Sequence, residues 1–242
     1  MVVEELWRYP VKSMGGEQLA VADVGELGID GDRQWAVIDL ATGYGLTAKR
    51  EPELLYASAS VIDGEVLIHL DADVTLTGTG AATDAVLSDW LGRAVSLRRA
   101  TPGSAGTFEI AADFEAEHDS DLLHWQGPEG TFHDSTRRRV SVAARREMRD
   151  WSPRRFRMNI LTSGDSSAGL VGSEVTIGST VLEIVKPVDR CILTTRAQPG
   201  GVERDLDVLR TINKELGGDL GVGAMVVAAG RIQEGDVIAT RR

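Results

Sequence analysis

The chain of 242 residues contains a single cysteine, Cys191. One thiol excludes a disulfide within the chain, and it excludes a zinc or iron–sulfur site built only from the cysteines of one chain. The longest nearly apolar run, residues 221–230, is too short to cross a bilayer. The N-terminus carries Glu4 and Glu5 where a secretion signal would have positive charge. We therefore expect a soluble, cytoplasmic protein that does not act at a membrane.

Positive charge is scarce and unevenly distributed. The net charge is −11, and only four of the 26 basic residues are lysines. Nine arginines lie between residues 137 and 157, where the net charge is +7, so the rest of the chain carries −18. An acidic body disfavours binding to nucleic acid, which requires many phosphates to be neutralised together. Two interpretations of the arginine-rich window stay open: a cleft for a small anionic ligand, or a solvated helix paired with acidic neighbours.

Short β-branched or alternating runs, separated by Gly, Asp and Asn, dominate the sequence. Asp63-Gly64 predicts a two-residue hairpin turn between two such runs. Many short strands and 27 glycines favour a mainly β fold with a few helices, as a barrel or a sandwich. The predicted strands are residues 2–9, 18–24, 34–39, 54–61, 66–70, 95–99, 158–163, 174–177, 181–185, 191–195 and 224–229.

Two segments have helical patterns. Residues 83–91 have Thr83 as the N-cap and stop at Gly92. Residues 204–216 end before two glycines and carry an apolar stripe that consists of Leu206, Leu209, Ile212 and Leu216. No βαβ alternation, glycine-rich phosphate loop or internal repeat is present in the sequence.

The least regular stretch is residues 100–130, which combine several glycines with a run of acids. Long structureless stretches inside compact domains are uncommon and often functional. We predict a linker or a long surface loop here. The domain boundary is placed near residue 98, which gives domains of residues 1–98 and 99–242.

Cys191, in the segment KPVDRCILTT, is the first candidate for chemistry. A thiol binds metal or attacks as the thiolate, which the charges of Arg190 and Lys186 favour and that of Asp189 disfavours. A lone cysteine is more often a small buried hydrophobic residue, and that alternative stays open. The four histidines form no recognised local signature, which gives little support to a Cys–His hydrolase.

Four further segments combine basic with small polar residues: YPVKS, GDRQW, TAKREP and RRFRMN. Arginine and lysine donors suit phosphate, and Ser or Asn adds further donors. Asn159 precedes an apolar run and is costly to bury without partners. Each segment alone is compatible with a surface ion pair or a turn. Together they predict one anionic ligand bound by segments that are distant in sequence.

The ordered set of motifs resembles a known family. LWRYPVKSMGG, GIDGDRQWAVID and TAKREPEL resemble the N-terminal β-barrel domain that precedes MOSC (molybdenum-cofactor-sulfurase C-terminal) domains. RRFRMNILTSG, KPVDRCILTT and GAMVVAAGRIQEGDVI resemble the MOSC domain itself. The resemblance implies an N-terminal β-barrel-like domain followed by a MOSC β-barrel. The resemblance also implies that the functional relatives of the chain are the mitochondrial amidoxime reducing component and its bacterial counterparts.

The resemblance implies a molybdenum cofactor, a pterin dithiolene with a phosphate. Cys191 would be its metal ligand and the catalytic residue. The phosphate end would be held by residues of the N-terminal motifs, namely Lys12, Ser13 and Arg33. The other implied cofactor-binding residues are Lys49, Ser135, Arg157, Asn159, Asp189 and Arg190. Of these, Arg157 and Asn159 match a pterin-binding Arg-x-Asn, and Asp189 and Arg190 flank the metal ligand.

The implied function is two-electron reduction of N-hydroxylated or N-oxide-type small molecules by a molybdenum-dependent reductase. With one cysteine, the chain would receive electrons from a separate ferredoxin- or flavoprotein-type protein. Pyridoxal phosphate is not expected, because the length leaves no room for a desulfurase domain. Two alternatives stay open: a non-enzymatic carrier of sulfur or of the cofactor on Cys191, and a β-barrel binding module for another phosphorylated ligand.

Overall fold

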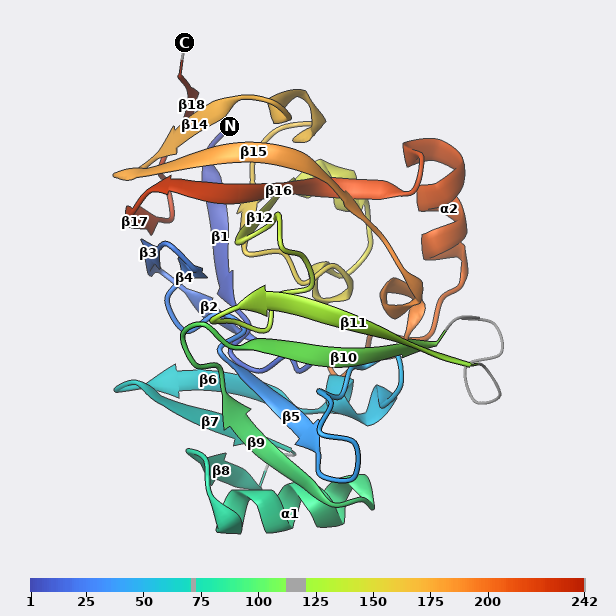
Figure 1. Cartoon of the computed structure of the whole chain (residues 1–242). Coiled ribbons are helices and arrows are strands. Elements are labelled where there is room, and N and C mark those ends of the chain that lie inside the picture. The colour runs from blue at the N-terminus through green and yellow to red at the C-terminus, as the bar shows by residue number, and fades with distance from the viewer. Residues whose placement is uncertain (71–72, 112–120, 242) are drawn as a thin grey trace. The chain divides into compact units, whose positions relative to one another are not determined.

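The structure, a computed structural model, describes all residues except 71–72, 112–120 and 242 (Figure 1). The chain forms two compact units. Unit 1 comprises Met1–Arg8, Gln18–Asp30 and Ser135–Arg242, and unit 2 comprises Tyr9–Glu17 and Gly31–Asp134. Two N-terminal segments join unit 1 because their strands pair with C-terminal strands. The boundary near residue 98 stays a prediction about the family domains.

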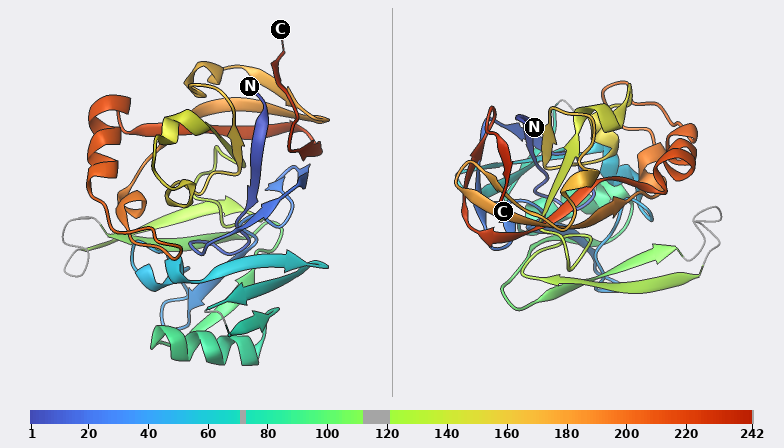
Figure 2. Two further views of the ribbon diagram at one scale, coloured as in Figure 1. Left: turned by 180° about the vertical axis from the view of Figure 1, so that it is seen from behind. Right: turned by 90° about the horizontal axis from the view of Figure 1, so that it is seen from above.

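Unit 1 is built on an eight-stranded sheet with the order β18-β14-β15-β16-β12-β13-β1-β2. Its longest strands, β15 and β16, run side by side in antiparallel pairing (Figure 2). Its strands are β1 (Val3–Arg8), β2 (Glu17–Leu19), β12 (Val140–Ala144), β13 (Ile160–Thr162), β14 (Glu174–Ile177), β15 (Thr180–Asp189), β16 (Asp219–Ala228) and β18 (Ile238–Thr240). A second sheet joins β17 (Gly230–Gln233), β3 (Val21–Gly25) and β4 (Gly28–Ile29).

Two apolar clusters stabilise unit 1. Alternating inward residues of the sheets, such as Leu6, Val142 and Ile184, form the first. The second lies under helix α2 (Asp207–Leu216), which buries Val208 and Ile212. Short 3-10 helices connect the strands: η2 (Arg145–Met148), η3 (Pro153–Arg155), η4 (Ala168–Leu170) and η5 (Ile192–Thr195).

The described part of unit 2 contains three small sheets, one α-helix and one 3-10 helix. They are β5 (Trp35–Asp39) with β9 (Val95–Arg99), β6 (Ser58–Ile62) with β7 (Glu65–His69) and β8 (Thr75–Thr77), and β10 (Ala105–Ala111) with β11 (Leu122–Glu129). Helix α1 (Ala81–Leu91) and the 3-10 helix η1 (Pro52–Tyr56) complete it. The expected fold class, mainly β with a few helices, is confirmed.

Three predicted strands are wrong in part or whole. Residues 18–24 form two strands of different sheets, β2 and β3, with a bend at Ala20 between them. Residues 54–61 begin as η1, which follows from Pro52 at a helical start, and only β6 is extended. Residues 191–195 form η5 instead of a strand. The hydroxyl of Thr194 donates to Cys191 O (2.9 Å) and that of Thr195 to Ile192 O (2.8 Å). These local bonds compete with a strand ladder, so β-branched residues adopt a turn.

The helix predictions need three corrections. Helix α1 begins at Ala81, so Thr83 lies inside it and donates to Gly78 O (3.0 Å) instead of capping it. Helix α2 begins at Asp207 and not at residue 204. Its buried pair is Val208 and Ile212, whereas Leu206 and Leu216 are exposed. Both helices end at a left-handed glycine, as the sequence predicts.

The prediction of a linker or loop over residues 100–130 is wrong for the described residues, because β10 and β11 pair there as an antiparallel ribbon. The reason lies in its glycines. A Cβ atom at Gly106 would lie 2.9 Å from the ring of Phe132, and one at Gly127 would lie 3.1 Å from the ring of Phe108. These glycines provide space for buried aromatic rings and do not mark a flexible segment.

The predicted hairpin turn is present between β6 and β7, where Asp63 (φ 51°) and Gly64 (φ 81°) form the two left-handed positions. A Cβ atom at Gly64 would meet no atom within 4 Å, so only the backbone resists a side chain. We expect Gly64→Ala to lower the free energy of unfolding by about 1 kcal/mol in urea titrations. Gly169→Ala, which also has open space but no positive φ, should change it by less than about 0.5 kcal/mol. Equal losses would contradict a backbone origin.

Candidate functional site

Lys12 is a buried cation of unit 2. Its Nζ donates to Phe132 O (3.0 Å) and pairs with the carboxylate of Asp134. The same atom lies 4.3 Å from the centroid of the Phe108 ring, a cation–π contact. The backbone N–H of Lys12 donates to Trp35 O (2.8 Å), which fixes the YPVKS segment beside β5. Lys12 is therefore a positioned ammonium group that pairs with a carboxylate of the protein itself.

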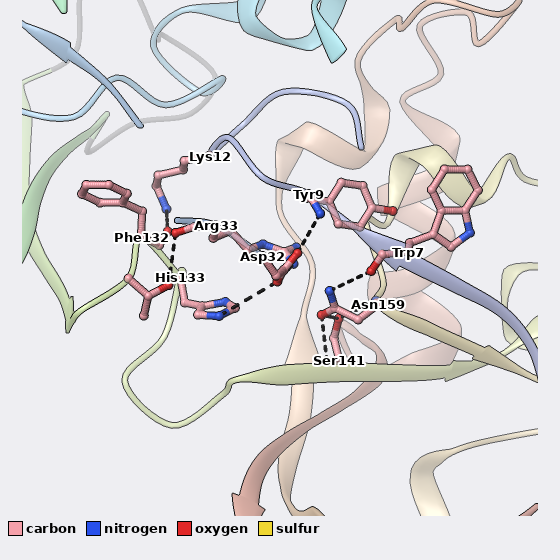
Figure 3. Close-up of polar contacts among 10 residues, drawn as sticks. Trp7, Tyr9, Lys12, Asp32, Arg33, Phe132, His133, Ser141 and Asn159 are labelled. Carbon is pink, nitrogen blue, oxygen red and sulfur yellow. Dashed lines mark hydrogen bonds and ion pairs between the residues drawn. The ribbon is translucent and has the colours of Figure 1, made fainter. Parts of the chain in front are cut away.

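Arg33 is the second buried cation of unit 2. Its Nη1 pairs with Asp32 Oδ2 at 2.5 Å, and its guanidinium lies 4.8 Å from the centroid of the Tyr9 ring. Burial lowers the pKa of Arg33, but the charges of Asp32 and Asp134 outweigh burial, so the pKa is raised above its ordinary value. Figure 3 shows Asp32 accepting from the backbone of Tyr9 (2.7 Å) and facing His133.

Ser13 and Lys49 are brought to one place in unit 2. Ser13 is buried, and its Oγ accepts the backbone N–H of Ala48 (2.9 Å). Lys49 follows in a turn in which the N–H groups of Arg50 and Glu51 donate to Thr47 O. The YPVKS and TAKREP segments, distant in sequence, therefore meet, and their binding of one anionic ligand stays a prediction.

Backbone strain marks three of the predicted residues. Five non-glycine residues of the described chain have positive φ: Ser13 (72°), Arg33 (50°), Asp63 (51°), Arg149 (54°) and Arg157 (52°). Asp63 belongs to the hairpin turn, and Arg149 ends η2. The other three are candidate cofactor-binding residues. A left-handed non-glycine residue costs about 1–3 kcal/mol and persists where its surroundings enforce it, often at functional sites.

Cys191 lies in unit 1 at the start of η5, with its side chain partly exposed. The turn that holds it is fixed from two sides. Its carbonyl accepts the N–H (3.1 Å) and the hydroxyl (2.9 Å) of Thr194. The buried guanidinium of Arg155 donates to Thr194 O (3.0 Å) and to Glu203 O (2.7 Å). The thiol is therefore presented by a turn with little freedom to move.

Arg190, which precedes Cys191, is held by neutral acceptors. Its Nε donates to Leu220 O (3.0 Å), its Nη1 to Phe156 O (2.9 Å), and its Nη2 to Met158 Sδ (2.8 Å). Burial, and then the charge of Arg138, lower the pKa of Arg190 to about 9, so it stays protonated at neutral pH. No carboxylate among the described residues accepts a hydrogen bond from it, and its charge interacts with Cys191 as well as with Asp189 and Glu147.

Asn159 connects three strands of unit 1 (Figure 3). Its Oδ1 accepts the N–H (3.1 Å) and the hydroxyl (2.8 Å) of Ser141, and its Nδ2 donates to Trp7 O (3.2 Å). These hydrogen bonds offset the desolvation cost of burying the Asn159 amide in apolar surroundings. In this structure Asn159 fixes the segment that carries Arg157, and its direct contact with a cofactor stays a prediction.

The remaining candidates occupy more exposed positions of unit 1. Asp189 pairs with Lys186 (Oδ1 to Nζ, 3.4 Å). Ser135 Oγ accepts the backbone N–H of Arg137 (3.2 Å). Arg190 bridges the Cys191 segment to residues 156–158, so unit 1 brings together the RRFRMN and KPVDRC motifs. Unit 2 brings together Lys12, Ser13, Arg33 and Lys49 through the contacts above.

Two family models match the chain. The MOSC N-terminal beta barrel domain matches residues 1–101, and the MOSC domain matches residues 126–239. The chain is a MOSC-domain protein. MOSC-domain proteins are associated with binding of the molybdenum cofactor.

Known proteins similar to this MOSC-domain protein are distant. A molybdenum cofactor sulfurase of Drosophila grimshawi is 23% identical over 245 aligned residues, which include 90% of this chain and 31% of that protein. The chain thus spans about a third of that relative's length. The YuaD protein of Bacillus subtilis aligns with a TM-score of 0.45 and 15% identity, over 98% of this chain and 93% of that one. YiiM of Geobacillus stearothermophilus aligns with a TM-score of 0.37 and 13% identity, over 50% and 67%.

The MOSC-domain protein has three charged residues in these networks that the sequence did not single out. Asp32 and Asp134 neutralise Arg33 and Lys12, and Arg155 holds the turn of Cys191. Asp32 could have been inferred, because an acid stands directly before Arg33 in GDRQW. Asp134 and Arg155 act on partners far away in the sequence, so no local pattern predicts them.

In the described part of the chain, no helix is long and apolar enough to cross a membrane.

Proposed function

We propose that this MOSC-domain protein binds the molybdenum cofactor and reduces N-hydroxylated or N-oxide-type small molecules by two electrons. The observation that carries the proposal is the arrangement at Cys191: a partly exposed thiol on a fixed turn, directly after an arginine whose acceptors are neutral. A thiolate is the form that binds metal, and Arg190 brings a positive charge beside the position of that ligand.

The donor set fits the cofactor. A thiolate is a soft ligand of the kind that sulfur-rich metal centres take, such as one whose other sulfur ligands come from a dithiolene. No group of three or more His, Cys, Asp or Glu side chains suited to a bare metal ion occurs among the described residues. In unit 2, the ammonium of Lys12 and the fork of Arg33 are suitable donors for a phosphate group. Unit 1 thus offers a metal ligand, and unit 2 offers donors for a phosphate group.

The roles of the protein follow from these positions. When bound, the cofactor would supply the two-electron redox chemistry, and the chain would hold and tune it. Cys191 would ligate the metal, and Arg190 would set the charge beside that ligand. Lys12, Ser13, Arg33 and Arg157 would anchor the organic part. A separate ferredoxin- or flavoprotein-type protein would deliver the electrons.

The test is to produce the protein in a host that makes the cofactor, and to measure molybdenum and turnover together. We expect near-stoichiometric molybdenum and reduction of an aryl amidoxime by a reduced viologen, in proportion to the molybdenum content. Bound molybdenum without turnover of amidoximes or N-oxides would contradict the reductase and leave cofactor binding intact. Absence of molybdenum would contradict both.

One observation favours a second candidate, a carrier of sulfur. The curated relative is a molybdenum cofactor sulfurase, although its aligned region is 31% of its length. A carrier would use the same exposed thiol, with a persulfide on Cys191. Mass spectrometry of the intact protein distinguishes the two, because a carrier gains the mass of one sulfur atom at Cys191 and shows no amidoxime turnover.

A further inference from the structure

The ion pair between Lys12 and Asp134 joins a buried group to an exposed one. The side chain of Lys12 is 3% exposed and that of Asp134 is 61% exposed. The ammonium also contacts neutral groups, namely Phe132 O and the rings of Phe108 and Trp125. The negative charge therefore reaches Lys12 from the solvent side.

A buried ammonium requires a counter-ion, because a charge that is removed from water and left unpaired strongly destabilises the protein. The nearby Asp32 is already committed: one carboxylate oxygen accepts the Tyr9 N–H (2.7 Å), and the other pairs with Arg33 (2.5 Å). Asp134 supplies the charge for Lys12, and it also acts on Arg33, whose pKa it helps to raise. One carboxylate thus faces both cations proposed to hold a phosphate.

Asp134 is also placed so that it can leave. It lies outside helices and strands, in the connection between β11 and β12. The residues before it are fixed, since Phe132 N donates to Arg33 O (2.8 Å) and His133 is buried. Rotation of Asp134 into water would break no strand pairing and would leave its carboxylate hydrated.

We propose that Asp134 is an exchangeable occupant of an anion site: its carboxylate pairs with Lys12 until the phosphate group of a ligand displaces it. The inference rests on the proposed function, in which Lys12 and Arg33 anchor the cofactor phosphate. A phosphate dianion carries more charge and more acceptor oxygens than a carboxylate, so it competes for the same donors. Asp134 thereby neutralises the buried Lys12 in the ligand-free protein. It also lowers the affinity of the site at Lys12 for phosphate.

The test is calorimetric titration of inorganic phosphate into cofactor-free protein. We expect Asp134→Asn to bind phosphate about tenfold more tightly than the wild type, a difference of about 1.4 kcal/mol. Asp134→Glu, which keeps the carboxylate, should remain within about threefold of the wild type, or about 0.6 kcal/mol. Lys12→Met should abolish binding in both the wild-type and the Asp134→Asn background. Thermal melts establish that each variant is folded, and Asp134→Ser serves as a second neutral variant.

The matched control is Glu53→Gln, which removes the same charge from an exposed carboxylate of unit 2 in η1. Its phosphate affinity should equal that of the wild type. An increase as large as that of Asp134→Asn would show a general effect of net charge and overturn the proposal. Unchanged affinity in Asp134→Asn, with binding still dependent on Lys12, would also overturn it and leave the phosphate anchor standing. Binding that ignores Lys12→Met would overturn the anion site and the role of Asp134 together.

A second arm separates this inference from the proposed function. Protein from a cofactor-producing host is oxidised, and released pterin is measured by fluorescence beside molybdenum. If the phosphate titrations behave as expected and neither pterin nor molybdenum is found, the role of Asp134 stands and the natural ligand is another phosphate compound. If pterin and molybdenum are found but Asp134→Asn does not change phosphate affinity, the proposed function stands and this inference fails.

Discussion

Replacing Cys191 with alanine should remove nearly all bound molybdenum while the protein stays folded. The side chain of Cys191 is partly exposed, so its loss opens no large cavity in the core. It also makes no capping hydrogen bond to η5 that the substitution would remove. The turn itself depends on other groups, namely the carbonyl of Cys191 and the guanidinium of Arg155. Elemental analysis of protein from a cofactor-producing host should show at least about a tenfold fall in molybdenum, the size expected for loss of a metal ligand or its support.

The control for this prediction is Ile192→Ala, which alters the neighbouring side chain of the same turn and leaves the thiol in place. It should retain most of the molybdenum. Full retention in Cys191→Ala would contradict metal ligation by this residue. Equal losses in both variants would show that the turn, and not the sulfur, is required. Pterin fluorescence measured on the same samples shows whether the anchors of unit 2 hold the organic part without the metal ligand.

Much of the β structure could be predicted because its physical signal is local. In β5, β7, β9 and β14 the apolar residues follow the pleat of a half-buried or buried strand, and the predicted ranges match within one residue. The turn at Asp63-Gly64 was predicted for the same reason, since the required left-handed positions are specified by those two residues. Prediction failed where the deciding contact is distant. Gly106 and Gly127 give room to rings of Phe132 and Phe108, and a glycine read alone indicates a loop.

The candidate site shows the same division. Its cations were predicted from short basic motifs, but their counter-ions were not. Nothing near Lys12 in the sequence indicates that Asp134, more than a hundred positions away, will neutralise it. The left-handed backbone of Ser13, Arg33 and Arg157 is equally invisible, because no glycine marks these positions. Motifs therefore located the charges, and only the structure shows how each charge is compensated.

Arg190 has only neutral hydrogen-bond acceptors among the described residues, and its replacement should lower stability strongly. Arg190→Met removes the side-chain donors that serve the carbonyls of two buried residues, Leu220 and Phe156. Each unsatisfied buried carbonyl costs about 1–3 kcal/mol, so the free energy of unfolding should fall by about 3–4 kcal/mol in urea titrations. The change also removes the positive charge beside Cys191, so bound molybdenum should fall even at temperatures where the variant is folded.

Two further variants separate charge from geometry. Arg190→Lys keeps the positive charge, but an ammonium lacks the planar fork that reaches three acceptors. Compared with Arg190→Met, we therefore expect it to restore the molybdenum content more fully than the free energy of unfolding. Arg210→Met removes an arginine from α2 whose side chain is 72% exposed and paired only with Asp207 among the described residues, and it should change stability by less than about 0.5 kcal/mol. Full stability in Arg190→Met would mean that water satisfies the two carbonyls. Normal molybdenum in that variant would contradict an electrostatic role for Arg190 at the metal ligand.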